Sequence, residues 1–260
     1  MPGPPGEMHA MFEEQVEPRL RELVDSDVTI TRNVKTMGMS EGAVDEVMSE
    51  FFGQQNPYLG IYSKADGIHL RVAARATDTV AAQSLIQPVE DAIVERLGPY
   101  IWGYDEETPE QAIAPVLKER GLTLATMESC TGGLLASTIT DVSGSSAYFK
   151  GGIVSYTNDL KEASGVDAAL IRKHGAVSQQ VAEAMAEAVR IRLRADFGIG
   201  ITGVAGPTGG TPEKPVGTVC IAAGAGEARR VITLSLPGDR IAIRHRSAQA
   251  ALNLVRGLLS

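Results

Sequence analysis

A cluster of small polar residues and glycines follows an apolar run near the middle of the chain. The segment Glu128-Ser129-Cys130-Thr131-Gly132-Gly133 stands between TLATM and LLASTIT, which predicts a turn from a strand into a helix. Such a turn points several N–H groups at one spot, and the helix dipole adds about half a positive charge there. The turn could hold a hydroxyl nucleophile at Ser129, or a phosphate or oxyanion cradle made by the backbone of Thr131 to Gly133. A capped helix with glycines for close packing is the alternative.

Serines precede the next apolar run, IVSY, and a lysine follows it. The preceding segment, residues 143–152, contains Ser145 and Ser146, and the following segment, residues 157–161, ends in Lys161. We expect both segments to converge on one edge of the sheet, where α/β folds place ligands. Loop serines and a solvated lysine are the alternative reading.

A hydrolytic serine needs a base, and Lys161 is the candidate because these motifs contain no suitable histidine. A lysine desolvated in a pocket loses proton affinity and can act as a general base near neutral pH. Ser129 and Lys161 are therefore predicted to form a catalytic dyad.

A long loop rich in glycine and proline follows a later apolar strand. Residues 202–218 contain five glycines, Gly203 and Gly206 among them, and three prolines. Loops of this length in compact domains are commonly binding loops, although a plain surface excursion is the alternative. It is not a phosphate-binding G-x-x-x-x-G-K-[ST] loop, because no lysine followed by Ser or Thr closes it.

The last helix is predicted to start at Asp239, which places Arg240 in its first turn, directly after Pro237-Gly238. A positive charge in a first helical turn opposes the helix dipole, so it calls for a carboxylate partner or an anionic ligand. A phosphate would meet that need, and pairing with Asp239 or a nearby acid would meet it equally well.

The histidines and cysteines do not form a metal-binding pattern. Cys130 and Cys220 are ninety residues apart, which indicates free thiols. The histidines are scattered without the spacing that places two ligands on one helix face: His9, His69, His174 and His245. We therefore expect no metal site and no cofactor.

The order of predicted elements indicates two domains after a short N-terminal segment. Residues 1–27 resemble the end of a preceding domain followed by a helix. Pro18 is expected to interrupt this helix. Residues 28–104 predict the order β-α-β-β-α-β, with a hairpin turn at Asp66-Gly67, which is typical of a small split α/β domain. Residues 105–260 alternate strands and helices, which predicts a three-layer α/β domain with a mixed sheet.

The charge is unevenly distributed between these parts. Residues 1–104 hold 16 acidic and 8 basic residues, whereas residues 105–260 hold 16 of each, so the net charge of −8 falls wholly in the first part. Nucleic-acid binding that is independent of sequence depends on Lys and Arg contacts, so we expect no nucleic-acid partner. The sequence contains no membrane-spanning run and no signal-peptide pattern, so we expect no membrane partner and a cytoplasmic location.

Seven ordered blocks of residues 107–258 resemble the C-terminal domain of the CinA family. They are ESCTGG, SGSSAYFKGG, SYTNDLK, GAVS, TGVAGPTGG, KPVGTV and PGDR. The resemblance implies a nicotinamide mononucleotide deamidase, which forms nicotinate mononucleotide and ammonia in bacterial NAD recycling. It also implies a homodimer or larger assembly and no metal requirement.

The resemblance assigns roles to particular residues. It implies that Ser129 and Lys161 form the catalytic pair, with substrate contacts at Ser146, Tyr156, Thr202 and Arg240, and it leaves open whether Ser129 or Ser146 attacks. With the turns described above, the expected substrate-binding residues are Thr131, Gly132, Ser145, Ser146, Tyr156, Thr202, Gly203, Gly206 and Arg240.

The N-terminal parts also resemble CinA proteins. Residues 28–104 are similar to the KH-like middle domain, but they lack the G-x-x-G loop with which KH domains grip nucleotides, so a spacer or dimerisation module is expected. The opening residues resemble the end of the molybdopterin-binding-like domain associated with ADP-ribose pyrophosphatase activity, and we expect that second activity to be absent.

Three other functions compete with amide hydrolysis. A non-catalytic nucleotide-binding or regulatory module would use the same turns to hold a phosphate. A phosphotransferase would need a metal, for which Glu128 and Asp159 are available. An adaptor with an eroded site would give the polar motif residues no reason to remain together.

Overall fold

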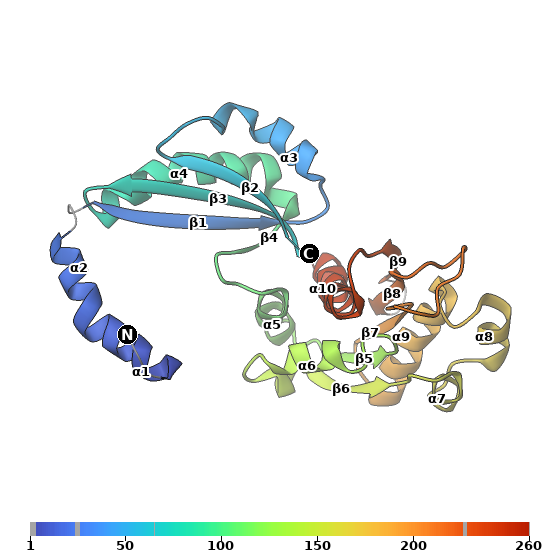
Figure 1. Ribbon diagram of the computed structural model, residues 1–260. Coiled ribbons are helices and arrows are strands. Elements are labelled where there is room, and N and C mark those ends of the chain that lie inside the picture. The colour runs from blue at the N-terminus through green and yellow to red at the C-terminus, as the bar shows by residue number, and fades with distance from the viewer. Residues whose placement is uncertain (1–3, 24–26, 65, 226–227, 260) are drawn as a thin grey trace. The chain divides into compact units, whose positions relative to one another are not determined.

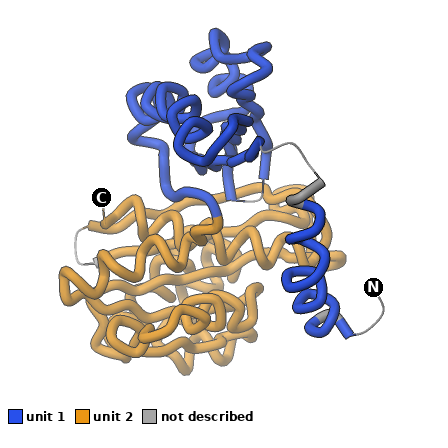
Figure 2. The backbone as a smooth tube through the Cα atoms, turned by 90° about the vertical axis from the view of Figure 1, so that its left-hand side faces the viewer, with its two compact units in different colours: residues 1–105 blue, residues 106–260 orange. Residues whose placement is uncertain are grey.

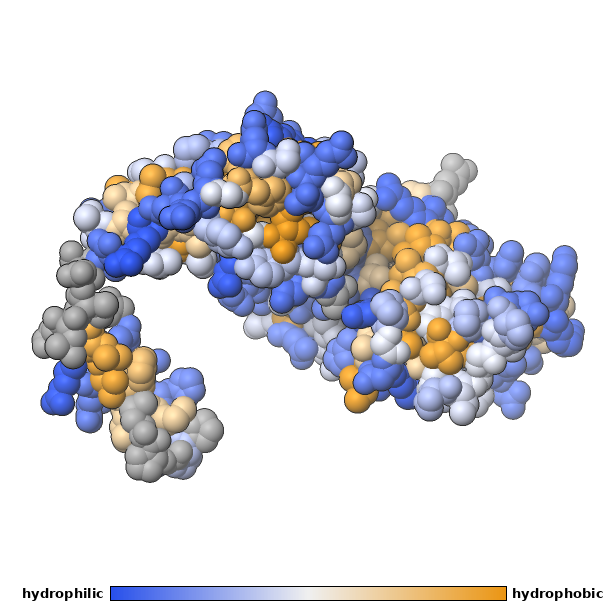
Figure 3. All heavy atoms as spheres, turned by 45° about the horizontal axis from the view of Figure 1, so that its top comes forward, coloured by the Kyte–Doolittle hydropathy of each residue, from blue (hydrophilic) through white to orange (hydrophobic). Residues whose placement is uncertain are grey.

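The computed structural model describes residues 4–23, 27–64, 66–225 and 228–259. The chain forms two compact units, Met1–Asp105 and Glu106–Ser260, which are coloured blue and orange in Figure 2. None of the helices in the described ranges combines the length and apolar composition that a bilayer crossing requires. On the face seen in Figure 3, hydrophilic residues are interspersed with smaller hydrophobic groups.

The first unit opens with two helices and continues as a four-stranded antiparallel sheet. Helices α1 (Pro5–Met11) and α2 (Glu17–Leu23) are joined by a π-helical turn, so the helix widens before Pro18 instead of breaking there. The sheet has the order β2-β3-β1-β4. Its strands are β1 (Val28–Thr36), β2 (Tyr58–Lys64), β3 (Gly67–Ala76) and β4 (Ile101–Tyr104).

Two helices cover one face of this sheet, as Figure 1 shows. They are α3 (Glu41–Met48) and α4 (Thr79–Leu97), and each begins at a side-chain cap: Ser40 Oγ accepts from Ala43 N, and Asp78 Oδ1 accepts from Ala81 N. A cluster of buried aliphatic residues joins the helices to the alternate strand positions that face them. The predicted β-α-β-β-α-β order is confirmed.

The second unit is a mixed five-stranded sheet with helices on both faces. The strand order is β6-β5-β7-β8-β9, in which β5 pairs in parallel with β6 and β7, and β7, β8 and β9 pair antiparallel. The strands are β5 (Leu124–Glu128), β6 (Phe149–Val154), β7 (Phe197–Gly203), β8 (Thr218–Ala225) and β9 (Ala228–Ser235).

Separate apolar clusters lie on the two faces of this sheet. One contains α5 (Pro109–Glu119), α6 (Leu134–Thr140) and α10 (Arg240–Leu259). The other contains α8 (Ala168–His174) and α9 (Gln179–Leu193), and the short helix α7 (Asn158–Ala163) follows β6. The predicted three-layer α/β architecture is therefore confirmed.

Two glycines of β7 let α9 lie directly against the sheet. A Cβ added at Gly200 would stand 2.1 Å from the carbonyl oxygen of Ala182, and one at Gly198 would stand 1.9 Å from that of Ala186. Both contacts are with backbone atoms, so neither can be relieved by rotating a side chain.

Gly200→Ala is therefore expected to destabilise the second unit by about 3 kcal/mol, because the helix must move away from the strand. Urea unfolding followed by circular dichroism measures this change. The matched control is Gly42→Ala in α3 of the first unit, where nothing lies within 4 Å of the added Cβ. Equal stability of Gly200→Ala and the parent chain would contradict the close helix–strand contact.

Candidate active site

Ser129 lies at the carboxyl end of β5, on the edge of the sheet where β7 also ends. Its backbone N–H donates to the carbonyl of Ile201 (2.9 Å), and the residue is 8% exposed. The chain then turns through Gly132 and Gly133, both at positive φ (62° and 93°), into α6. The strand-to-helix turn expected from the sequence is therefore present.

Lys161 reaches Ser129 from α7. Its amine hydrogen bonds to Ser129 Oγ (3.0 Å) and donates to the carbonyl oxygen of Ser155 (2.8 Å). The short helix is held by Thr157, whose Oγ1 accepts from Leu160 N at 3.3 Å. The structure therefore brings together the two residues that the sequence pairs as a dyad.

Burial determines the protonation behaviour of this pair. Lys161 is 1% exposed, and no carboxylate in the described part of the chain forms an ion pair with it. Desolvation lowers the pKa of the Lys161 amine, because the charged form loses its hydration. A neutral amine can accept a proton from the Ser129 hydroxyl, which is the role of a general base.

Cys130, the residue next to Ser129, has a thiol of low nucleophilic reactivity. Burial raises the pKa of its thiol to about 11, so the group is protonated at neutral pH. Because the thiolate is the reactive form of cysteine, Cys130 is a poor competitor for the nucleophile's role.

A cavity of about 370 Å³ opens beside Ser129. Its lining comes from the turn after β5, the segment after β6, the segment before α9, the loop after β7 and the start of α10. The lining residues are Ser129, Cys130, Tyr156, Val177, Gly203, Val204, Ala205, Gly206, Thr208, Gly209 and Arg240. Of the residues expected to bind substrate, the cavity thus includes Tyr156, Gly203, Gly206 and Arg240.

Arg240 closes one side of this cavity. Its guanidinium donates to the carbonyl of Gly206 (2.8 Å) and to the hydroxyl of Tyr156 (2.8 Å). Tyr156 is 53% exposed. The sequence predicts a carboxylate or an anionic ligand as the partner of Arg240, whereas in the structure the guanidinium donates to two neutral oxygens. Asp239 instead caps α10, accepting from Ala242 N at 2.8 Å.

The N-terminus of α6 is occupied by a side chain of the protein itself. The carboxylate of Glu128, which is 1% exposed, accepts from the N–H groups of Gly133 (3.0 Å), Leu135 (3.1 Å) and Ala136 (2.8 Å). Gly132 N–H donates to the carbonyl of Ser129 (3.1 Å). The cradle expected from the backbone of Thr131 to Gly133 is thus largely used within the turn, and a substrate phosphate has no place at this helix end.

Glu128→Gln is expected to destabilise the second unit by about 1–3 kcal/mol, because the amide NH₂ must face N–H donors that the carboxylate now satisfies. Chemical denaturation compares the variant with Glu162→Gln, which changes the same functional group at an exposed position of α7. Equal losses in the two variants would argue against the capping role of Glu128.

Other expected residues lie outside the cavity lining. Thr131 is fully buried, and its carbonyl accepts from Arg244 Nη2 (2.7 Å), a residue one helical turn beyond Arg240 that the sequence did not single out. Thr202 is 1% exposed and donates its hydroxyl to the carbonyl of Ala176 (2.8 Å). In this structure both residues hold the backbone around the site.

Within one chain, Ser145 and Ser146 lie far from Ser129 and Lys161. They lie in a 3-10 turn before β6, and Leu124 at the start of β5 pairs with Phe149 at the start of β6. Residues that precede a parallel strand lie at its amino end, whereas Ser129 follows the carboxyl end of β5. Five residues of extended strand separate the two edges by about 17 Å. The expected convergence of both segments thus holds only for the segment after β6.

Both units of the chain match known protein families. The CinA C-terminal domain family matches residues 106–259, and the family described as the damage-inducible protein CinA KH domain matches residues 31–103. The chain belongs to the CinA family. A CinA-like protein of Kosmotoga olearia is 43% identical over 261 residues, covering all of this chain and 63% of its own length. One of Gloeobacter violaceus is 45% identical over 259 residues, covering 98% of this chain and 61% of its own length.

Solved CinA-family structures resemble part of the chain. The crystal structure of the competence/damage inducible protein CihA from Agrobacterium tumefaciens is 38% identical, covers 58% of this chain and 94% of its own, and gives a TM-score of 0.57. A CinA superfamily protein from Enterobacter cloacae is 30% identical, covers 60% of this chain and 95% of its own, and also gives a TM-score of 0.57. The present chain spans less than two thirds of the length of the curated relatives described above.

Proposed function

We propose that the second unit is an amidohydrolase that converts nicotinamide mononucleotide to nicotinate mononucleotide and ammonia. The observation that carries the proposal is a buried serine–lysine pair at 3.0 Å, beside a cavity lined by one arginine. Membership of the CinA family supports the choice of substrate, because the sequence resemblance implies a nicotinamide mononucleotide deamidase.

In the first half of the proposed reaction, Ser129 Oγ attacks the carboxamide carbon while Lys161 Nζ accepts the hydroxyl proton. The hydrogen bond from Lys161 to the Ser155 carbonyl orients the amine, so that its lone pair can face Ser129. The tetrahedral intermediate then collapses: the C–N bond breaks, Lys161 returns the proton to the leaving nitrogen, and ammonia departs.

In the second half, water hydrolyses the acyl-enzyme. The neutral amine of Lys161 accepts a proton from the attacking water, and the bond between the acyl carbon and Ser129 Oγ breaks. Lys161 passes this proton to Ser129 Oγ, and the nicotinic acid group that forms gives its own proton to the released ammonia, so that nicotinate mononucleotide leaves as a carboxylate. The dyad, one water and the released ammonia together balance these steps.

The substrate phosphate is placed at Arg240 in this proposal. Among the described residues that line the cavity, Arg240 is basic and none carries a carboxylate. The negative charge of Glu128 at the α6 N-terminus disfavours a second anion there. Arg240 would exchange its bonds to neutral oxygens for charge-assisted bonds to phosphate.

The proposal is tested by incubating the chain with nicotinamide mononucleotide and measuring both products. We expect one ammonia for each nicotinate mononucleotide formed. Saturable binding without ammonia would instead favour a nucleotide-binding or regulatory module, because that reading keeps the cavity and removes the chemistry.

The phosphotransferase alternative is weakened by the position of its metal candidates. Both carboxylate oxygens of Glu128 already accept N–H bonds, and Asp159 is exposed on α7. Among the described residues, no three His, Cys, Asp or Glu side chains are grouped so that they could hold a metal ion. Turnover that requires a divalent metal and is lost in EDTA would restore this alternative.

The pH dependence of ammonia release is expected to follow Lys161. A general base works only when deprotonated, so kcat should rise with pH and level off above the pKa of the Lys161 amine. Burial lowers that pKa, so the midpoint should lie below the ordinary lysine value of about 10.4. A pH–rate profile for kcat, taken within the range where circular dichroism shows an intact fold, measures it. A rate that falls as pH rises through neutrality would contradict base catalysis by this amine.

A further inference from the structure

The acidic residues of the first unit are kept out of its sheet. The four strands, all within the described residues, contain no Asp and no Glu, although residues 1–104 contain 16. The strands contain basic residues instead. The negative charge that dominates this part of the sequence therefore lies on the helices and connecting segments.

One face of the sheet is covered by α3 and α4, and the other carries the polar strand positions. Because side chains alternate between faces along a strand, the residues opposite the apolar core share this second face. We call it the basic face, and its exposed members are Thr29, Thr31, Tyr58, Tyr62, Lys64, Arg71 and Arg75. Its exposed charged side chains on the strands are all cations.

Two tyrosines form an aromatic site on edge strand β2 of the basic face. A Cβ added at Gly60 would lie 3.0 Å from ring carbons of both Tyr58 and Tyr62, so the two rings lean over the bare backbone between them. The side chains remain 48% and 38% exposed. Arg71 is the register partner of Gly60, which places a cation on the neighbouring strand beside the pair.

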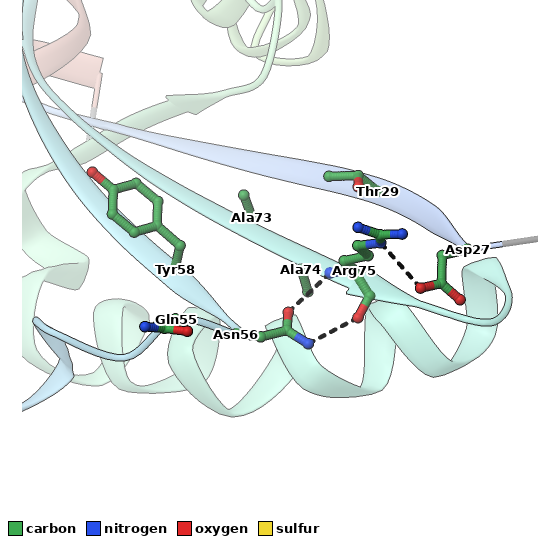
Figure 4. A pocket seen from close by; sticks show the side chains of 8 residues that line it. All are labelled: Asp27, Thr29, Gln55, Asn56, Tyr58, Ala73, Ala74 and Arg75. Atoms are coloured by element: carbon green, nitrogen blue, oxygen red, sulfur yellow. Dashed lines mark hydrogen bonds and ion pairs between the residues drawn. The ribbon is translucent and has the colours of Figure 1, made fainter. Parts of the chain in front are cut away.

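An open groove of about 600 Å³ extends the aromatic site toward the other end of the face. Figure 4 shows Tyr58, Ala73 and Thr29 on three neighbouring strands, with Arg75 beside them. The acid that reaches this groove is Asp27, whose carboxylate accepts from Arg75 Nε at 3.0 Å. At the hairpin end, Asp66 pairs with His69 (3.0 Å).

We propose that the basic face binds single-stranded nucleic acid, with bases stacked on Tyr58 and Tyr62 and phosphates against Lys64, Arg71 and Arg75. Stacking on aromatic side chains flanked by cations is how sheets hold unpaired bases without sequence preference. A duplex hides its base faces and cannot use the tyrosines. A second copy of the chain apposed through this face would bring like charges together.

The proposal revises the expectation drawn from net charge. Net charge averages over the whole chain, whereas a bound strand experiences the charges within a Debye length, about 10 Å at 0.1 M salt. Acidic side chains on α3 and α4 lie on the far side of the sheet, with the apolar core between. The face that a ligand meets is locally positive.

Fluorescence anisotropy of the whole chain with a labelled twelve-nucleotide oligo(dT), oligo(U) or matched duplex tests this proposal. We expect both single strands to bind at low salt with Kd of roughly 10⁻⁴–10⁻⁶ M and the duplex to bind at least tenfold more weakly. If the three cations neutralise about three phosphates, the logarithm of the association constant should fall with the logarithm of the salt concentration with a slope of roughly −2.

Variants then locate the site. Tyr58→Ala and Tyr62→Ala should each weaken binding by about 5- to 100-fold through lost stacking. Asp27→Asn should strengthen binding several-fold, because it releases Arg75. Tyr100→Ala, which removes a similarly exposed tyrosine outside the face, and Lys173→Ala, which removes an exposed cation of α8, should leave affinity unchanged.

Four results would overturn the proposal. They are no binding at 50 mM salt, equal binding of duplex and single strand, equal loss in the control variants, and unaltered binding after either tyrosine is removed while circular dichroism shows a native fold. Sedimentation in which Tyr58→Ala changes the oligomeric state would identify the face as a contact between copies and would also count against it.

Discussion

Replacing Ser129 with alanine is expected to lower kcat for ammonia release on the order of 10³–10⁶-fold, because the proposed acyl-enzyme cannot form without the hydroxyl. The substitution removes one oxygen from a side chain that is 8% exposed and whose backbone contacts are independent of it. The fold should therefore remain intact. Single-turnover assays with nicotinamide mononucleotide measure the loss, and circular dichroism checks the fold.

Two matched variants decide whether the loss belongs to this hydroxyl. Cys130→Ala changes the neighbouring cavity residue, whose thiol has a pKa raised to about 11, and should keep most of the activity. Ser146→Ala changes an exposed serine at the opposite edge of the sheet and should also be active if the reaction needs one chain. An active Ser129→Ala protein with an inactive Ser146→Ala protein would transfer the nucleophile's role to Ser146.

The dyad could be predicted from sequence because its positions depend on strand ends. Ser129 directly follows β5 and Lys161 lies one short helix after β6, and parallel neighbouring strands end at the same edge. The same rule, applied to the start of β6, explains why Ser145 and Ser146 lie elsewhere. The sequence shows which residues border a strand, and the strand's direction decides which of them meet.

The contacts of Glu128 and Arg240 could not be predicted in this way. Glu128 ends β5, and whether its carboxylate points to a metal, to solvent or back onto α6 depends on how the glycine turn closes. Arg240 finds its partners, Gly206 and Tyr156, in segments 34 and 84 residues away. The order of strands and helices in the first unit was predicted, but net charge concealed that the acids avoid its strands.

Replacing Lys161 with methionine is expected to lower kcat by about 10²–10⁴-fold, the usual contribution of a general base. Methionine keeps much of the apolar stem and cannot accept a proton, so Ser129 loses its activation while the buried volume is largely preserved. Single-turnover and steady-state assays should show the loss in kcat, with KM nearly unchanged because Lys161 lies behind Ser129 and outside the cavity lining.

Stability provides the control for this variant. Burial lowers the pKa of Lys161, so between the folded and unfolded pKa values the unfolded chain binds a proton that the folded chain does not. The parent's stability therefore falls as pH decreases from the ordinary lysine value, about 10.4, toward the folded value. Lys161→Met lacks this penalty, so its advantage over the parent should shrink as pH rises toward that upper limit. An inactive variant that is less stable than the parent at neutral pH would point to a structural role for the lysine, whereas an inactive and more stable one identifies a buried amine kept for its chemistry.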